Sequence, residues 1–186
     1  PKGPWMALAD PQSAIKGRLV FSIDMTPDRS FTALGASGKR ADGLRHVEVI
    51  DHKRGSGWTL DRAIELDRKW HPIGWVVDPA GPAGSLIAGM EAAGLNVIKP
   101  TARDAMQACG QFYDAVMDTA SLRHRGQEPL NTALAGADRR PLGDGWAWDR
   151  KALSADISPL VAVTNAAWGF EVFGHEEEIN IANHIW

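Results

Sequence analysis

Several features that mark other protein classes are scarce or missing in this chain of 186 residues. Cys109 is the only cysteine, so no disulfide can form within the chain, and its apolar, helix-like surroundings predict a structural thiol. No apolar run approaches the roughly 18 residues that a membrane span needs, and no signal-peptide pattern opens the chain. We therefore expect a soluble protein that is neither secreted nor embedded in a membrane.

An excess of positive charge is also lacking, because the formal net charge at pH 7 is -3. Nucleic-acid-binding surfaces are usually strongly positive, so the overall charge argues weakly against such a ligand. The basic residues form short clusters, mostly where turns or element ends are expected. Solvated loop charge is the ordinary interpretation of any one cluster.

The composition that remains is that of an ordinary globular domain, with 44% hydrophobic and 23% charged residues. The length suits one well-buried core. Proline and glycine without a clear period predict an arm or linker over residues 1–17. We assign the folded domain to residues 18–170 and an acidic C-terminal tail to residues 171–186.

Hydrophobic periodicity predicts a fold in which strands and helices alternate after an initial group of strands. The first three strands, with a turn over residues 35–43 marking their second hairpin, form an antiparallel meander. Strands and helices then alternate in the order expected for parallel strands joined by crossovers. The predicted strands are 18–24, 29–36, 44–51, 73–77, 95–98, 121–125 and 146–149, and the predicted helices are 58–70, 86–93, 101–117, 128–137 and 154–168.

Three aspartates, Asp24, Asp78 and Asp156, stand where a short apolar element meets a turn. A carboxylate at the end of an apolar strand is costly to bury alone, so three that converge would need a charge partner. The simplest such partner is a divalent metal ion. Asp144 and Asp149 are alternatives for the third position, because both lie shortly before the last predicted helix.

Each aspartate also has a purely structural explanation. Asp24 could form an Asx turn, Asp78 could begin a turn before its proline, and Asp156 could cap a helix. Taken singly, these explanations are the better ones. The order of the three aspartates along the predicted elements favours the metal site.

Three segments, taken together with that order, resemble a known family over about residues 18–169. They are FSIDMTPDRS (21–30), VVDPAG (76–81) and LSADISPLVAV (153–163). The chain resembles the RNase H-like nucleases, and among them the nuclease domain of a tailed-bacteriophage terminase large subunit. The resemblance implies an α/β fold with a mixed central sheet flanked by helices. It also implies that the first and fourth strands are neighbours, which would place Asp24 beside Asp78, with Asp156 arriving from a packed helix.

The resemblance further implies a function and its partners. Asp24, Asp78 and Asp156 would be catalytic metal ligands for two Mg²⁺ or Mn²⁺ ions, and Asp28 would be a less certain outer ligand. The enzyme would be an endonuclease that cuts concatemeric double-stranded viral DNA in the cytoplasm of the infected bacterium. An ATPase motor domain of the same protein, the terminase small subunit and the portal would be its partners. The residues proposed to touch DNA phosphates are Lys53, Arg54, Arg123, Arg125, Arg139 and Arg140.

A phosphate-binding loop of the Walker A type is missing, since GASGKR (35–40) lacks both its spacing and its final Ser or Thr. The resemblance thus covers the nuclease part alone, and residues 1–17 would be a remnant of the interdomain linker. Three alternatives stay open at this point. They are a catalytically silent RNase H-like module that binds DNA or a packaging partner, another RNase H-like nuclease of the resolvase or transposase type, and a nucleotide-binding domain of the actin and sugar-kinase type.

Overall fold

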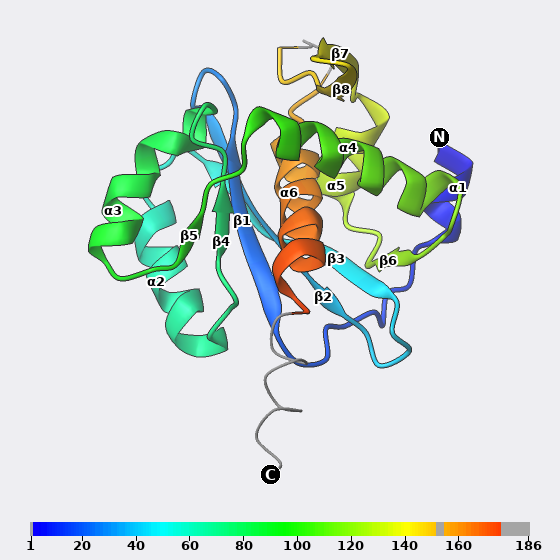
Figure 1. Cartoon of the computed structure of the whole chain (residues 1–186), viewed down its shortest axis with the longest axis horizontal. Helices are drawn as coiled ribbons and strands as arrows, with labels where there is room; N and C mark the ends of the chain where they lie inside the picture. Colours follow the sequence, from blue (N-terminus) through cyan, green and yellow to red (C-terminus); the bar gives the residue numbers. More distant parts are fainter. Residues whose placement is uncertain (1, 152–154, 176–186) are drawn as a thin grey trace.

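The computed structural model describes residues 2–151 and 155–175, which fold around one central sheet (Figure 1). Six strands form the central sheet, and two more form a small separate hairpin. The strands are β1 (Leu19–Met25), β2 (Phe31–Lys39), β3 (Arg45–Arg54), β4 (Trp75–Val77), β5 (Val97–Ile98), β6 (Leu122–His124), β7 (Arg139–Leu142) and β8 (Gly145–Trp148). The helices are α1 (Lys2–Ala7), α2 (Thr59–Trp70), α3 (Ile87–Ala92), α4 (Ala102–Met117), α5 (Glu128–Ala135) and α6 (Ser158–Phe173), with a 3-10 turn η1 (Pro82–Leu86).

The central sheet has the strand order β5-β4-β1-β2-β3-β6. The first three strands are antiparallel neighbours, while β4 is parallel to β1, β5 to β4, and β6 to β3. The predicted α/β fold with an antiparallel meander and added parallel strands is therefore confirmed. Within the described residues, no helix is both long and apolar enough to cross a membrane.

Successive side chains of β1 point to opposite faces of the sheet. Phe21 and Ile23 pack with α2 and α3 on one face. Val20 lies on the other face, against Trp168 of α6, and Asp24 shares that face because it is four residues further along the strand. Figure 1 shows α6 lying across β1, β2 and β3, with α4 and α5 beyond it.

Helix α6 is buried on all sides, since every residue from Ser158 to Phe170 is buried. A helix that is apolar all round is typical of the centre of a protein, and α6 lies between the sheet and helices α4 and α5. The sequence predicted a helix with a single apolar stripe that begins at 154. Residues 152–154 lie outside the described residues, and the described helix begins at Ser158.

The predicted turn over residues 35–43 is wrong in its first half, because β2 continues through Lys39. Glycine usually marks a turn, but Gly35 lies within β2 at a point where the backbone of α6 packs closely against the strand. A Cβ atom at this position would lie 2.7 Å from the carbonyl carbon of Ala162 and 2.8 Å from the amide nitrogen of Val163. Gly35 therefore serves close packing, and the turn begins after Lys39.

We predict that Gly35→Ala lowers the free energy of unfolding by about 2 kcal/mol, because neither backbone atom can move without shifting α6. Urea unfolding followed by circular dichroism measures this change. Gly110→Ala in α4 is the matched control, because nothing lies within 4 Å of the added methyl group. Alanine is the better helix former, so the control is expected to gain up to about 1 kcal/mol. Equal effects of the two substitutions would contradict the close-packing argument.

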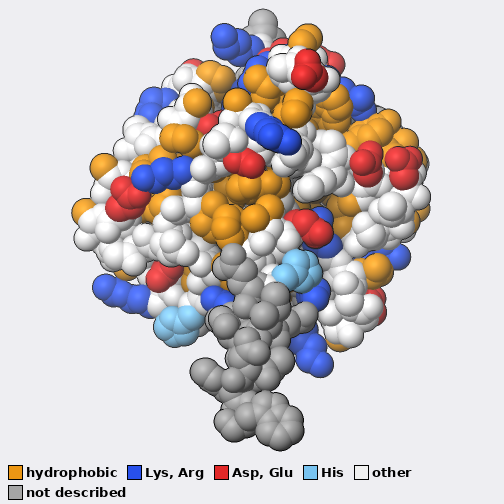
Figure 2. Space-filling view, viewed as in Figure 1, with side chains coloured by type: hydrophobic (Ala, Val, Ile, Leu, Met, Phe, Trp, Pro, Cys, Tyr) orange, Lys and Arg blue, Asp and Glu red, His pale blue; other side chains and the backbone are white. Residues whose placement is uncertain are grey.

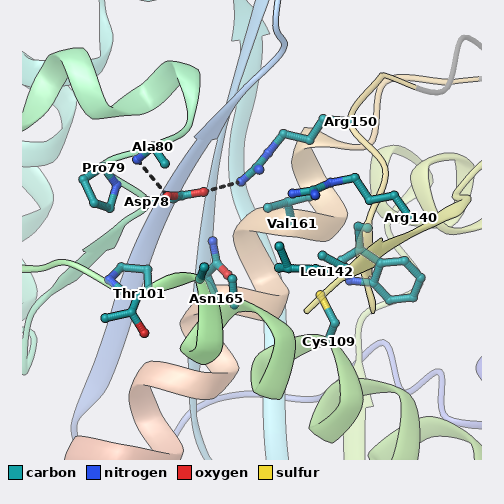
Figure 3. Close-up of a pocket in the computed structure, with 15 residues that line it drawn as sticks. Asp78, Pro79, Ala80, Thr101, Cys109, Arg140, Leu142, Arg150, Val161 and Asn165 are labelled. Atoms are coloured by element: carbon teal, nitrogen blue, oxygen red, sulfur yellow. Dashed lines mark hydrogen bonds and ion pairs between the residues drawn. The ribbon is translucent and has the colours of Figure 1, made fainter. Parts of the chain in front are cut away.

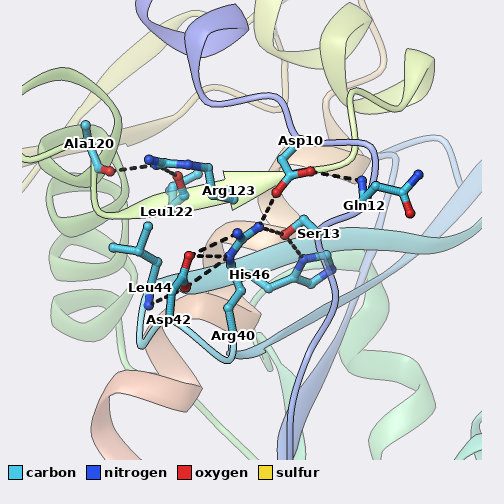
Figure 4. A network of polar contacts seen from close by, with 10 residues as sticks. All are labelled: Asp10, Gln12, Ser13, Arg40, Asp42, Leu44, His46, Ala120, Leu122 and Arg123. Carbon is cyan, nitrogen blue, oxygen red and sulfur yellow. Dashed lines mark hydrogen bonds and ion pairs between the residues drawn. The ribbon is translucent and has the colours of Figure 1, made fainter.

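The N-terminal segment is more ordered than the predicted arm. Trp5 of α1 is 1% exposed and stacks on His124, with ring centroids 3.6 Å apart. Its indole N–H donates a hydrogen bond to Asn131 Oδ1, at 2.7 Å. The Arg40 guanidinium then holds Asp10 at 2.7 Å (Figure 4). Residues 2–7 of this segment thus form a helix that packs onto the domain, whereas the assignment of residues 1–17 as an arm or linker remnant stays a prediction.

The predicted acidic tail overlaps the end of α6. Residues 171–173 belong to this helix, and residues 176–186 lie outside the described residues. The division of the chain at residue 170 also stays a prediction.

Candidate metal centre

Strands β1 and β4 place two of the three predicted aspartates side by side. Ile23 of β1 pairs in register with Val77 of β4, so the next residues, Asp24 and Asp78, stand at the same edge of the sheet. The two strands are parallel, and both carboxylates therefore meet at the carboxyl ends of the strands. The structure brings these two predicted site residues together.

A guanidinium group joins the two carboxylates. Arg150 Nη2 lies 2.9 Å from Asp24 Oδ1 and 3.3 Å from Asp78 Oδ2, and Figure 3 shows the contact with Asp78. Burial raises the pKa of Asp24 to about 6, because lost hydration outweighs the opposing charge of Arg150. The charge of Asp24 in turn raises the pKa of Arg150. This pair of carboxylates thus requires a positive charge beside it.

Sequence reasoning missed Arg150. It follows β8 and Asp149, and neither helical nor strand periodicity distinguishes it from an ordinary turn residue. The β7–β8 hairpin that carries it was only half predicted, because its first strand was interpreted as a turn. Only the folded chain brings residue 150 to residues 24 and 78.

The third predicted aspartate, Asp156, has other partners. Its Oδ2 lies 2.7 Å from His52 Nε2, and its Oδ1 accepts a hydrogen bond from the Ser158 amide at the start of α6. Burial disfavours its charged form, but the hydrogen bonds from His52 and Ser158 outweigh this effect and lower the pKa of Asp156.

The sheet register relates this third aspartate to the first two. Asp24 pairs with Ala33 of β2, and Ala33 pairs with His52 of β3, so the three residues form a row across one face. Adjacent strands lie about 4.8 Å apart, so His52 is roughly 10 Å from Asp24 along the row. Within residues 2–151 and 155–175, no group of three or more His, Cys, Asp and Glu side chains is arranged to hold a metal ion. The structure therefore assembles two of the three carboxylates and leaves the third on the same face.

The other aspartates considered from the sequence have local roles. Asp28 accepts hydrogen bonds from the Ser30 amide and hydroxyl, which lower the pKa of Asp28 to about 2. Asp149 accepts from the Lys151 amide. Asp144 lies in the tight turn between β7 and β8. In the described part of the chain, none of these three shares a hydrogen-bond or ion-pair partner with Asp24 or Asp78.

The six basic residues proposed for DNA contact lie in different places. Lys53 and Arg54 end β3, directly after His52, at the edge where the aspartates stand. Arg123 and Arg125 lie in and after β6, which pairs with the opposite end of β3. At about 3.3 Å per residue that end is roughly 20 Å away from His52. Figure 2 shows Lys and Arg side chains scattered over the viewed face rather than gathered in one patch.

The remaining two basic residues are neighbours in β7. Arg139 stacks on the rings of Tyr113 and Trp146, each centroid 4.3 Å from its guanidinium carbon. Arg140 instead lines a cavity of about 330 Å³ that begins at Asp78, which we call the Asp78 pocket. Its walls come from the loop after β4, from α4, from the β7–β8 hairpin with Arg150, and from α6. Arg140 is thus the proposed DNA contact that lines the same cavity as Asp78.

The mixed sheet combines an antiparallel meander with a crossover to a parallel fourth strand beside the first, and carboxylates stand at the ends of both of these strands. This combination defines an RNase H-like fold. Among solved structures, the chain is similar to the HK97 bacteriophage large terminase, with a TM-score of 0.73 and 14% identity over 91% of this chain and 43% of that one. It is also similar to the large terminase nuclease from thermophilic phage G20c, with a TM-score of 0.61 and 13% identity over 85% and 83% of the two chains.

A third similar structure is a K428A mutant nuclease domain of the large terminase subunit gp2 of bacterial virus Sf6 with manganese. Its TM-score is 0.60, at 14% identity over 88% of this chain and 96% of that one. No protein-family model matches the chain, and no curated protein matches its sequence. The fold is therefore that of the nuclease domain of phage large terminases, and the chain spans less than half of the HK97 protein.

Proposed function

We propose that this chain is the metal-dependent endonuclease domain of a viral DNA-packaging terminase. The observation that carries the proposal is a pair of carboxylates at the ends of adjacent parallel strands, the buried Asp24 and the half-buried Asp78, which is 18% exposed. Such a pair is costly without a cation between its members. The fold agrees, since the similar structures are terminase nucleases and one of them, from phage G20c, has bound magnesium.

The carboxylate pair fits a divalent metal ion by its chemistry. All donors are carboxylate oxygens, which Mg²⁺ and Mn²⁺ prefer. Asp24 and Asp78 would hold the metal, and Asp156 would join them after release from His52, giving a site for two ions. Bound there, the ions would activate water and stabilise the leaving oxygen of a phosphodiester.

The chain's own residues have separate tasks in this proposal. Arg150 neutralises the carboxylates in the metal-free protein, and its guanidinium is then available for a substrate phosphate. His52 orients Asp156 before it joins the site. Lys53, Arg54 and Arg140 would contact the DNA backbone at the same edge of the sheet, and such contacts position DNA without reading its sequence.

The proposed substrate is concatemeric double-stranded DNA, and cutting is expected to be largely independent of sequence. The chain spans 43% of the HK97 large terminase, so an ATPase motor in the same full-length protein is part of the proposal. The terminase small subunit and the portal would then set where and when the domain cuts. These events would take place in the cytoplasm of the infected host.

We expect supercoiled plasmid to be cut in the presence of Mn²⁺ or Mg²⁺ and to stay intact with EDTA. Asp156→Asn is expected to reduce the cutting rate by at least about 100-fold if this carboxylate joins the pair, since a lost metal ligand removes several kcal/mol of transition-state stabilisation. Asp144→Asn, in the hairpin turn, is the matched control and should cut normally. Cutting in EDTA would exclude the metal-dependent proposal.

A second candidate is a catalytically silent DNA-binding module. The observation that favours it is the position of Arg150 between the two carboxylates, together with the pairing of Asp156 with His52. Wild-type protein that binds DNA but cuts it with neither metal ion would support this candidate.

A further inference from the structure

The Asp78 pocket contains two polar side chains that the fold itself does not use. Asn165 of α6 is 6% exposed, and its side-chain amide has no hydrogen-bond partner in the described part of the chain. Its amide atoms are not among the fully buried polar atoms, so they reach the solvent in the pocket and can bond to a ligand there. Figure 3 shows this amide pointing into the pocket toward Asp78.

The second unused group is a cation. Arg140 enters the pocket from β7, and within residues 2–151 and 155–175 its guanidinium has no hydrogen-bond or ion-pair partner. Arg150 enters from the adjacent segment, and among the described residues its guanidinium is held by Asp24 and Asp78. In Figure 3 both guanidinium groups point into the space beside the Asp78 carboxylate. This end of the pocket is therefore suited to a phosphate group.

Apart from Thr101, the rest of the pocket lining is largely apolar. Cys109, Val161 and Trp148 contribute apolar surface to the lining. A volume of about 330 Å³ is at the lower end of the range of about 300 to 1,000 Å³ that is typical of ligand pockets. This space suits a single nucleotide but not a base pair. A phosphate-binding end, a buried amide and an apolar interior are the three features that a nucleotide requires.

Resting on the nuclease proposed above, we propose that the Asp78 pocket binds one unpaired nucleotide of the DNA strand that is cut. Its phosphate would lie between Arg140 and Arg150, and its base would enter the apolar interior with an edge bonded to Asn165. A base inside a duplex is stacked and cannot enter, so the nucleotide must leave the stack or lie at an unpaired end. The pocket would thereby select DNA that is locally opened next to Asp78.

The single cysteine provides a probe of this pocket alone. Cys109 lines the pocket but is only 5% exposed, and burial raises the pKa of its thiol to about 11, so its slow labelling by methyl methanethiosulfonate is followed at pH 9 by mass spectrometry and reports whether the pocket is filled. With Ca²⁺ present to limit cutting, DNA with an unpaired single-stranded end is expected to slow labelling at least about fivefold, and blunt duplex less than twofold. Equal protection by the two DNAs, or by neither, would overturn the proposal.

Binding measured by fluorescence anisotropy gives a second readout. Arg140→Gln and Ala105→Phe, which fills the pocket from α4, are expected to weaken binding of the unpaired-end DNA at least fivefold and of blunt duplex less than twofold. Arg68→Gln on the exposed surface of α2 is the matched control and should change neither. Circular dichroism and thermal unfolding check that each variant folds. Equal weakening for both DNAs would mean that Arg140 is a general backbone contact and would overturn the pocket assignment.

Free deoxynucleoside monophosphates test whether the ligand of the pocket is a free nucleotide rather than a nucleotide of a DNA strand. If dAMP at millimolar concentration protected Cys109 and DNA ends did not, the ligand would be a free nucleotide and the strand assignment would be wrong. The nuclease proposal is tested separately by plasmid cutting. A wild type that cuts plasmid without protection of Cys109 would refute only the pocket, and protection without cutting would refute only the nuclease.

Discussion

The Asp24→Asn variant is expected to keep its fold and to lose DNA cutting by at least about three orders of magnitude. This loss corresponds to about 4 kcal/mol of transition-state stabilisation, which is the scale of a metal ion acting at a phosphoryl group. Asparagine has the shape of aspartate but not its charge, so the site keeps its packing and loses affinity for the cation. Plasmid cutting in Mn²⁺ and calorimetric titration of Mn²⁺ measure the two effects.

The control for Asp24 is an aspartate of the same chain that lies away from the site. Asp61 is exposed on α2, on the opposite face of the sheet. Asp61→Asn is expected to cut DNA and bind Mn²⁺ like the wild type, whereas Asp78→Asn should behave like Asp24→Asn. An Asp24→Asn protein that binds Mn²⁺ and cuts normally would remove the basis of the proposed function.

The Arg150→Ala variant is expected to lose about 3 kcal/mol of stability in EDTA. Removal of one partner of a buried ion pair leaves the other charge without compensation, and here two carboxylates are left together. Divalent metal is expected to restore most of this stability, because an ion bound only by the folded state stabilises it. Urea unfolding with EDTA and with Mn²⁺ measures the difference, and Arg68→Ala is the matched control.

The same variant makes a second, independent measurement possible. If Arg150 occupies the position that a cation would take, its removal should tighten Mn²⁺ binding while the metal-free protein becomes less stable. A variant that is less stable in EDTA but binds Mn²⁺ no more tightly would show that the guanidinium and the metal do not compete.

Much of the scaffold could be predicted from the sequence because its signals are local. Thr101 and Asp104 form a reciprocal capping box, and α4 begins and ends where the cap and the apolar spacing predict. The adjacency of Asp24 and Asp78 followed from the resemblance, which implies neighbouring first and fourth strands. The fold comparison confirms that architecture.

The remaining features depend on contacts between distant segments. Gly35 indicated a turn because nothing in the sequence shows that α6 will lie on it. Trp5 looked like part of an arm, because its partners His124 and Asn131 are more than 100 positions away in the printed sequence. Arg150 and Asn165 carry no pattern at all, and their importance arises from the two carboxylates and the pocket that the fold places beside them.

The burial of α6 on all sides has a consequence for synthesis on the ribosome. This helix follows all eight described strands in the chain, yet it fills the centre of the molecule. Until residues through Phe173 have left the ribosome, the face of the sheet that α6 covers stays exposed and Asp156 has no fixed place. The nascent chain would therefore be exposed to aggregation until α6 has been synthesised, and Asp156 would reach the face that carries Asp24 only when this helix inserts.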